Sequence, residues 1–329
     1  MKQPLILRHH QNCGGEMYSA INNIPNTFHD ISKIDLQIKD TLNRKLLLDQ
    51  YTIASPVVFG GVGVHSGKAV CMIVHPTTVD HGIVFERTDI EDQPNRIRAS
   101  WTMVQSTNMC TTIANHFGVS VATVEHILAA LTGIGITNAH ITIDGPEVPI
   151  MDGCSQAFCE GILEAGTVRQ SKKRHKLNIT HTVKVENEHG WAQISPSDTS
   201  LFSVHFTPSQ RYEGLTGDQH QEFSLLEDDF TKLVAGARTF GFYEDAQKLW
   251  AAGLAKGASL DNTVVIHKGT VMNESGLRFT NELVRHKLLD AIGDIALAEY
   301  LLVGHYEALN PGHTLNYQLL KKYFEEISA

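Results

Sequence analysis

The amino-acid sequence predicts an α+β protein made of two similar halves, each a β-sheet layered on helices. The chain has 329 residues, enough for two domains of about 150 residues each. In each half, strand-like segments come first and helical segments follow. A polar, charged junction at residues 171–176 separates the two patterns. The shared order of elements in the two halves indicates a duplicated two-layer unit, although no repeat is visible residue by residue.

Three segments are expected from these patterns. Residues 1–50 are an N-terminal extension of unknown role, in which positions 30–49 match an amphipathic helix. Residues 51–171 form the first α+β domain and residues 172–329 the second.

In the first half, apolar and β-branched runs predict strands at 51–55, 57–59, 68–75, 82–86, 96–100, 109–113 and 138–143. A short strand after Val119 gives way to a helix for which Thr123 is the expected N-cap and Gly133 or Gly135 the stop. Another helix, 156–165, closes this half.

The glycine-rich segment 60–67 raises the question of a dinucleotide-binding loop. Its glycines have the wrong spacing, and a strand-like run follows where a helix N-terminus would have to hold pyrophosphate. A tight hairpin fits better.

The second half restarts with strands at 177–179, 182–186, 191–194 and 201–206. Next come an acidic helical run from Leu225, a helix at 244–255 and a strand at 262–267. The stretch 282–305 has helical periodicity, and a strand around Tyr306 and a helix from Thr314 complete the half.

Composition excludes several classes of protein. The net charge of −9, without a large basic cluster, argues against a nucleic-acid partner. No run of 18 apolar residues predicts a membrane span, although peripheral association is left open. The N-terminus lacks a secretory signal, and the five cysteines form no Cys-x-x-Cys pair, so reduced thiols in the cytoplasm are expected.

The helical stretch that begins at residue 282 carries the first candidate chemistry. His286, Asp290 and Asp294 recur every fourth residue, opposite an apolar side that includes Leu288 and Ile292. Side chains four apart on a helix are neighbours, so a His/Asp pair here could supply two ligands of a zinc ion. A surface ion pair is the alternative.

Glu125 and His126 start the helix of the first half, and they form the second candidate. Adjacent helical residues project about 100° apart, which allows one to bind a metal ion while the other stays free beside it. His126 would then be the third ligand and Glu125 the base that a hydrolytic zinc site needs. A solvated helix start is the alternative.

His313 follows a Pro-Gly turn, from which it could reach a cleft as a general acid. A nearby carboxylate such as Asp294 would raise its pKa. Thr239 and Lys287 are donors that could steady an oxyanion or an anionic substrate. Taken alone, His313 fits an exposed or helix-capping histidine better than a general acid.

Six motifs taken together resemble one known family. They are Gly-Val-His-Ser-Gly at 63–67, Thr-Val-Glu-His at 123–126, Pro-Glu-Val-Pro-Ile-Met-Asp-Gly at 146–153, Ala-Arg-Thr-Phe-Gly-Phe at 237–242, Val-Arg-His-Lys-Leu-Leu-Asp-Ala-Ile-Gly-Asp at 284–294 and Gly-His-Thr-Leu-Asn at 312–316. In this order they resemble the UDP-3-O-acyl-N-acetylglucosamine deacetylases, zinc amidases of lipid A synthesis. The resemblance spans roughly residues 50–325 and leaves the N-terminal extension outside.

The resemblance implies two domains with the active site between them and Zn²⁺ as cofactor. It implies that His126, His286 and Asp290 bind zinc, Glu125 is the base, and His313, oriented by Asp294, protonates the amine. Thr239 would stabilise the oxyanion and Lys287 would help bind substrate. Positions that line the substrate site would be Met109, Cys110 and Phe240. The acyl chain would enter a passage within residues 253–276.

The expected reaction is therefore hydrolysis of the N-acetyl group of an acylated UDP-amino sugar, a small-molecule substrate, with release of acetate. The alternative from another class is a non-catalytic, regulatory sugar-nucleotide binder with a structural zinc, which the extension 1–50 would suit. A zinc amidohydrolase of different specificity is a third interpretation. Retention of both the base and the acid favours the enzyme.

Overall fold

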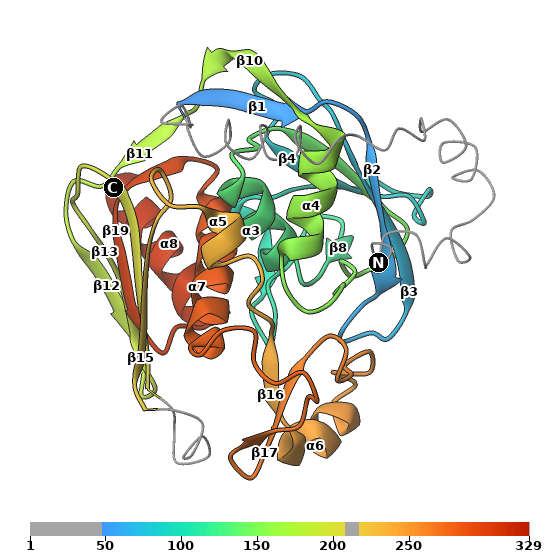
Figure 1. The fold of residues 1–329 in the computed structure, drawn as a ribbon. Helices are drawn as coiled ribbons and strands as arrows, with labels where there is room; N and C mark the ends of the chain where they lie inside the picture. The colour runs from blue at the N-terminus through green and yellow to red at the C-terminus, as the bar shows by residue number, and fades with distance from the viewer. Residues whose placement is uncertain (1–47, 208–216, 329) are drawn as a thin grey trace.

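The computed structural model describes residues 48–207 and 217–328. Most of the helix expected at 30–49 lies outside this range, and its last residue, Asp49, begins a strand instead. Two larger sheets and the helices between them make up the body of the described chain (Figure 1).

The first larger sheet has five strands in the spatial order β2-β3-β9-β4-β5. β9 is the last of them in sequence yet lies at the centre, parallel to β4, and all other neighbours are antiparallel. β2 and β3 form the hairpin expected around the glycine-rich loop, so the dinucleotide interpretation is excluded by the strand that follows. The strands are β2 Val57–Val62, β3 Ala69–His75, β4 Ile83–Arg87, β5 Arg96–Arg98 and β9 Ala139–Ile143.

The second larger sheet repeats this topology. Its order is β12-β13-β19-β14-β15, with β19 last in sequence, central, and parallel to β14. A short strand, β11, adds to one end of β19. The strands are β11 Lys176–Asn178, β12 Val183–Glu186, β13 Trp191–Ser195, β14 Ser200–Phe206, β15 Gln219–Ser224 and β19 Leu301–Leu309. The same strand order in both halves confirms the predicted duplicated α+β architecture.

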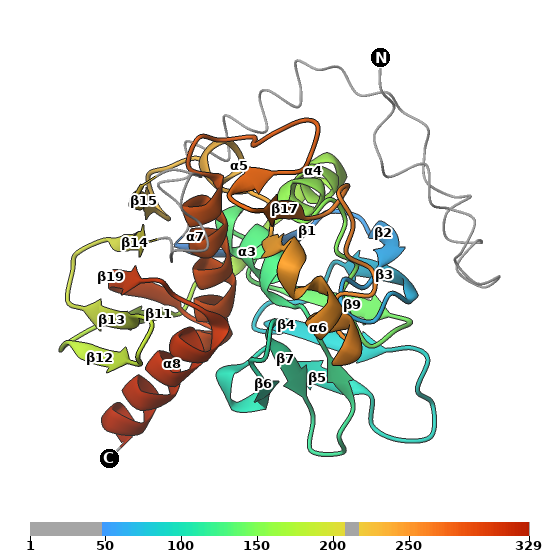
Figure 2. The same ribbon diagram turned by 90° about the horizontal axis from the view of Figure 1, so that it is seen from below.

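Each larger sheet also has one helix before its central strand and one after it. These are α3 Glu125–Gly133 and α4 Gln156–Ala165 in the first half, and α7 Glu282–Ile295 and α8 His313–Ser328 in the second. The helices lie between the two sheets, with α3 and α7 side by side (Figures 1 and 2). α7 is consequently buried on almost every side, including the side that carries His286, Asp290 and Asp294.

Smaller elements complete the described chain. β1 Asp49–Ile53 pairs with β10 Thr167–Lys173. A three-stranded sheet in the first half comprises β6 Val104–Ser106, β7 Thr112–Ala114 and β8 Ser120–Val121. Another in the second half comprises β16 Phe240–Phe242, β17 Val264–His267 and β18 Thr270–Val271. The short helices are η3 Trp101–Met103, α5 Phe230–Leu233, η5 Tyr243–Asp245, α6 Ala246–Ala251 and η6 Ala296–Ala298.

Several element boundaries differ from the sequence predictions. The helical stretch 282–305 ends at Ile295, because Glu299 adopts a left-handed conformation with φ 65° and the apolar run from Leu301 joins β19. Thr123 is not the N-cap: it has φ 59°, its hydroxyl donates to buried Glu147 at 3.0 Å, and the cap is Val124.

The other differences concern lengths and one omission. The run from Leu225 is helical only in the four residues of α5, and the helix expected at 244–255 shortens to η5 and α6. β15 was not predicted, because its polar sequence Gln-His-Gln-Glu-Phe-Ser lacks the apolar alternation of a strand. His313 is the first residue of α8 and not part of the loop before it.

Four cysteines in the described part of the chain are buried and not disulfide-bonded, namely Cys71, Cys110, Cys154 and Cys159. Among the described residues, none of the helices combines the length and apolarity that crossing a bilayer requires.

Candidate active site

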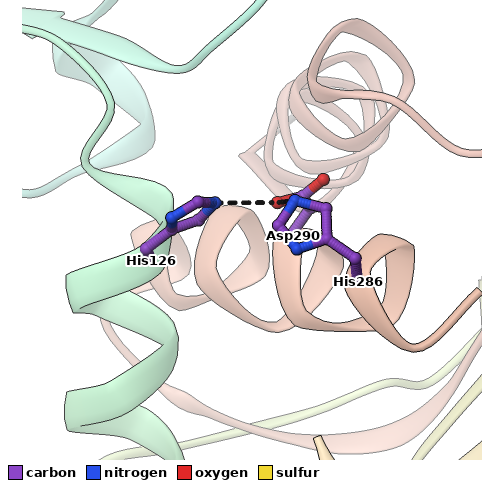
Figure 3. A group of neighbouring side chains, drawn as sticks. All are labelled: His126, His286 and Asp290. Carbon is purple, nitrogen blue, oxygen red and sulfur yellow. Dashed lines mark ion pairs between the residues drawn. The ribbon is translucent and has the colours of Figure 1, made fainter. Parts of the chain in front are cut away.

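Three buried side chains from the two halves of the chain converge between α3 and α7 (Figure 3). His126 comes from the first turn of α3, while His286 and Asp290 lie one turn apart on α7. Oδ1 of Asp290 is 3.6 Å from Nε2 of His126 and 3.4 Å from Nε2 of His286. The two imidazole rings are nearly perpendicular, with centroids 5.1 Å apart.

These atoms match a metal centre better than a hydrogen-bonded cluster. Distances of 3.4 and 3.6 Å are too long for good hydrogen bonds, and Oδ1 of Asp290 is buried without a hydrogen-bond partner in the described part of the chain. Nitrogen ligands of a tetrahedral zinc at about 2.0–2.1 Å lie about 3.3–3.4 Å from one another. The donor set of two imidazoles and one carboxylate leaves a fourth position open.

The electrostatics of the cluster favour metal-binding protonation states. Burial lowers the pKa of His286 to about 4, despite Asp290, so its imidazole is neutral at pH 7. Its Nδ1 donates to the Ala237 carbonyl at 3.0 Å, which leaves the Nε2 lone pair directed at the cluster. Burial alone would raise the pKa of Asp290, but His286 and His126 outweigh it and hold that pKa well below its usual range.

A second group, Glu125, Asp294 and His313, lies beside the first. Nδ1 of His313 is 2.9 Å from Oδ2 of Asp294, and Nε2 of His313 is 3.8 Å from Oε1 of Glu125. Both oxygens of Asp294 already accept hydrogen bonds, from Thr111 Oγ1 at 2.6 Å and from Asn316 Nδ2 at 2.8 Å. Both carboxylate oxygens of Asp294 are therefore occupied by hydrogen bonds and are not available to a metal ion. This second group is suited to proton transfer, whereas the group that contains Asp290 is suited to binding a metal ion.

Glu125 and His313 of this second group have displaced pKa values. Burial raises the pKa of Glu125 to about 7, against the opposing effects of His313 and His126. Burial would lower the pKa of His313, but the carboxylates of Asp294 and Glu125 outweigh it and raise that pKa to about 10. At a pH between these two values Glu125 is ionised and His313 is protonated, as the base and the acid of a catalytic pair would need to be.

Comparison with known proteins agrees with this geometry. A family model described as UDP-3-O-acyl N-acetylglycosamine deacetylase matches residues 50–325. The chain is 40% identical over 282 residues to the UDP-3-O-acyl-N-acetylglucosamine deacetylases of Brucella ovis, Brucella canis and Brucella suis. These matches cover 85% of this chain and 96% of each relative. This chain belongs to the UDP-3-O-acyl N-acetylglycosamine deacetylase family.

In this deacetylase-family chain, the other predicted site residues also lie around the two groups. Thr239, Phe240 and Lys287 are half-buried, and Thr239 follows two residues after the carbonyl that orients His286. The Phe240 ring is 6.1 Å from the His286 ring, and Nζ of Lys287 lies 5.4 Å from the Phe240 centroid. Phe240 therefore lies beside the candidate metal centre with Lys287 next to it, and Thr239 is adjacent to Phe240 in the chain.

Met109 and Cys110 immediately precede Thr111, which contacts the group of Glu125, Asp294 and His313 from the first half. The next residue, Thr111, donates its amide hydrogen to Oε2 of Glu125 at 3.1 Å. Met109 is half exposed and adopts φ 66°, whereas Cys110 is buried. Burial, helped by Glu125, raises the pKa of the Cys110 thiol to about 12, so at neutral pH the thiol stays protonated and is a poor nucleophile.

The sequence analysis did not identify the residues that orient Glu125 and Asp294. Thr111 bridges them: its amide binds Glu125 and its hydroxyl binds Asp294. Asn316 holds the second oxygen of Asp294 and accepts from the Tyr306 hydroxyl at 2.7 Å. The spacing of Asn316 three residues after His313 was a usable signal, because such residues are neighbours on a helix.

A buried ion pair supporting His286 also escaped prediction. Nε of Arg238 is 2.8 Å from Oε1 of Glu282, and this same oxygen accepts the Arg238 amide hydrogen at 3.0 Å. Glu282 lies one turn before His286 on α7, and the Arg238 amide belongs to the same peptide unit as the Ala237 carbonyl. The pair thereby fixes the carbonyl that orients His286, and no sequence spacing links residues so far apart.

Proposed function

We propose that this protein hydrolyses the N-acetyl group of UDP-3-O-(hydroxyacyl)-N-acetylglucosamine, releasing acetate, as a step of lipid A biosynthesis. One observation supports the proposal most strongly. In a chain of this family, the buried set His126, His286 and Asp290 lies beside Glu125 and His313, whose pKa values differ as those of a base and an acid should. A structural metal site would not need the acid–base pair, so the catalytic function is favoured over the regulatory alternative.

The metal ion in this proposal is Zn²⁺, held by His126, His286 and Asp290. Two imidazoles and one carboxylate, with a fourth position left open, form the type of ligand set found in catalytic zinc sites. When bound, zinc would act as a Lewis acid and lower the pKa of a coordinated water. The unpartnered Asp290 oxygen and the neutral His286 support this assignment.

Glu125 is proposed as the general base and His313 as the general acid. Glu125 would accept the proton of the attacking water while that oxygen bonds to the acetyl carbon. As the C–N bond breaks, His313 would donate its proton to the amine, so that the products are acetate and the free amino sugar. Asp294 contacts no substrate in this scheme and keeps His313 protonated and oriented.

The remaining residues are proposed to bind the substrate. The Thr239 hydroxyl would stabilise the developing oxyanion, and Lys287 would bind an anionic part of the sugar nucleotide. Met109, Cys110 and Phe240 would line the substrate site. The acyl chain would enter a passage formed by an insertion within residues 253–276. This segment contacts the first half, because the Gly257 amide donates to the Val64 carbonyl at 3.0 Å.

The division into an extension, 1–50, and two domains, 51–171 and 172–329, is proposed on the basis of the two matching sheets. Each domain has its own sheet and helix pair, and the two ligand-bearing helices come from different domains. We also propose a cytoplasmic location, where the sugar-nucleotide substrate would be available.

A deacetylation assay combined with metal analysis tests the function. Purified protein is incubated with the acylated sugar nucleotide, and acetate release and zinc content are measured together. The proposal predicts about one zinc per chain and acetate release that stops on chelation. Zinc without any acetate release would favour the regulatory alternative, and activity only on other amides would favour a different amidohydrolase.

A further inference from the structure

A cavity of about 120 Å³ lies where the two halves of the chain join, away from the candidate active site. Its walls come from the C-terminal half of α3, the start of β4, the residues that follow η6, and the segment between β10 and β11. That last segment is the connection between the two larger sheets (Figure 1). Thr132, which lines the cavity, is six residues beyond His126, or about 9 Å along the helix axis.

Arg174 supplies an unpaired positive charge to this cavity. It lies between β10 and β11, and its side chain is half-buried. Within residues 48–207 and 217–328, its Nη1 atom is buried and has no hydrogen-bond partner. Burial lowers the pKa of the guanidinium to about 10, so it remains charged at neutral pH. A buried guanidinium nitrogen without a partner is costly, because its desolvation is not compensated.

The carboxylates in the cavity wall do not compensate Arg174, because each has other partners. Asp80 is paired with Lys172 and accepts from Gln50 Nε2 at 2.7 Å. Glu299 is paired with Arg98. In the described chain, neither carboxylate forms an ion pair or a hydrogen bond with Arg174.

Arg174 is not needed to cap the C-terminus of α3 either. Arginine often binds the free carbonyls at a helix end. Here the carbonyls of Ala130, Leu131 and Thr132 already accept the amide hydrogens of Ile134, Ile136 and Gly135, at 3.0, 2.8 and 3.1 Å. The end of the helix is therefore capped by its own backbone, without any need for Arg174.

We propose that this cavity binds a small oxyanion, a phosphate or carboxylate group, through the Arg174 guanidinium. The planar fork of a guanidinium matches two oxygens of such a group. A volume of about 150 Å³ holds a molecule the size of benzene, so a space of about 120 Å³ accommodates an ion such as inorganic phosphate. The site is distinct from the substrate site and does not depend on the proposed reaction.

Calorimetric titration of the full chain with inorganic phosphate, at constant ionic strength maintained with chloride, tests the proposal. We expect saturable binding that Arg174→Gln weakens at least tenfold. Arg96→Gln, which removes an exposed arginine of β5, should bind like the wild type. A parallel titration with acetate shows whether the group preferred is a phosphate or a carboxylate. Absence of saturable binding of either anion, or equal binding by Arg174→Gln, would overturn the proposal.

A second measurement tests the proposal on the wild-type protein, in case Arg174→Gln does not fold. Wild-type crystals soaked in tungstate, a heavy tetrahedral oxyanion, should show a strong anomalous peak next to the Arg174 guanidinium. Ordered water alone at that position would contradict the inference.

Discussion

Gly293 on α7 packs directly on the backbone of Glu125 at the start of α3. A Cβ atom at residue 293 would lie 2.0 Å from the Glu125 carbonyl oxygen and 2.8 Å from its carbon. The absence of a side chain at this one position therefore allows the two helices to approach. Since Glu125 and His126 begin α3 while Asp290 and Asp294 flank Gly293 on α7, this contact sets the distance between the two halves of the site.

Gly293→Ala should separate the helices and damage the metal centre. Overpacking of this kind costs about 1–3 kcal/mol, and the clash here is with backbone, which cannot rotate away. We expect a lower free energy of unfolding in urea and weaker zinc binding. Gly236→Ala is the matched control, because its Cβ would find its nearest neighbours at an ordinary 3.5 Å. Equal stability and equal zinc content in both variants would show that the close approach is not required.

Glu125→Ala and His313→Ala should each separate metal binding from catalysis. General acid or base catalysis contributes about 10²–10⁴-fold, so kcat should fall by that factor in either variant. Zinc content should stay at the wild-type level, because neither residue belongs to the His-His-Asp set. Near-normal turnover in either variant would remove the role assigned to that residue.

Asp294→Asn should move the basic side of the pH–rate profile. The base works only when ionised, so the rate falls as the pH drops through the pKa of Glu125, about 7 or lower once a cation is bound nearby. The acid works only when protonated, so the rate falls as the pH rises through the pKa of His313, about 10. Without the Asp294 charge, burial dominates and lowers the pKa of His313, so the basic limb should shift to lower pH. An unchanged basic limb would mean that another group sets it.

Glu282→Gln should destabilise the protein. Removing one partner of a buried ion pair costs about 3–5 kcal/mol, because the other charge is left uncompensated. The side chains of Glu282 and Arg238 are 0% and 4% exposed. Glu186→Gln is the control, since its pair with Lys184 is exposed and such pairs contribute about 0–1 kcal/mol. Urea unfolding that gave similar losses for both variants would contradict the structural role of the buried pair.

The sequence was sufficient to predict much of the fold. Period-two and helical patterns located most strands, the bounds of α4 and the hairpin β2–β3, since these depend on local chemistry. The end of α7 was missed because an apolar run such as 296–305 suits a helix and a buried strand equally well. The left-handed conformation of Glu299 ends the helical segment, and pairing with β13 and β14 makes the residues from Leu301 a strand.

The candidate site likewise combines residues that the sequence predicted with residues that it did not. The spacing of His286, Asp290 and Asp294 on one helix pointed to a shared location, as did the position of His126 at a helix start. The groups that orient them, such as the Ala237 carbonyl and the Thr111 hydroxyl, come from distant segments and from the backbone. Their positions follow from how α3 packs on α7, which local sequence patterns do not encode.

Anomalous diffraction at the zinc absorption edge tests most directly whether α3 and α7 jointly hold one zinc ion. We expect a single strong peak between the two helices, about 2.0–2.2 Å from Nε2 of His126, Nε2 of His286 and a carboxylate oxygen of Asp290. Crystals of Asp290→Ala should lose most of that peak. A peak located elsewhere, or one coordinated by α7 alone with His126 out of reach, would contradict the account.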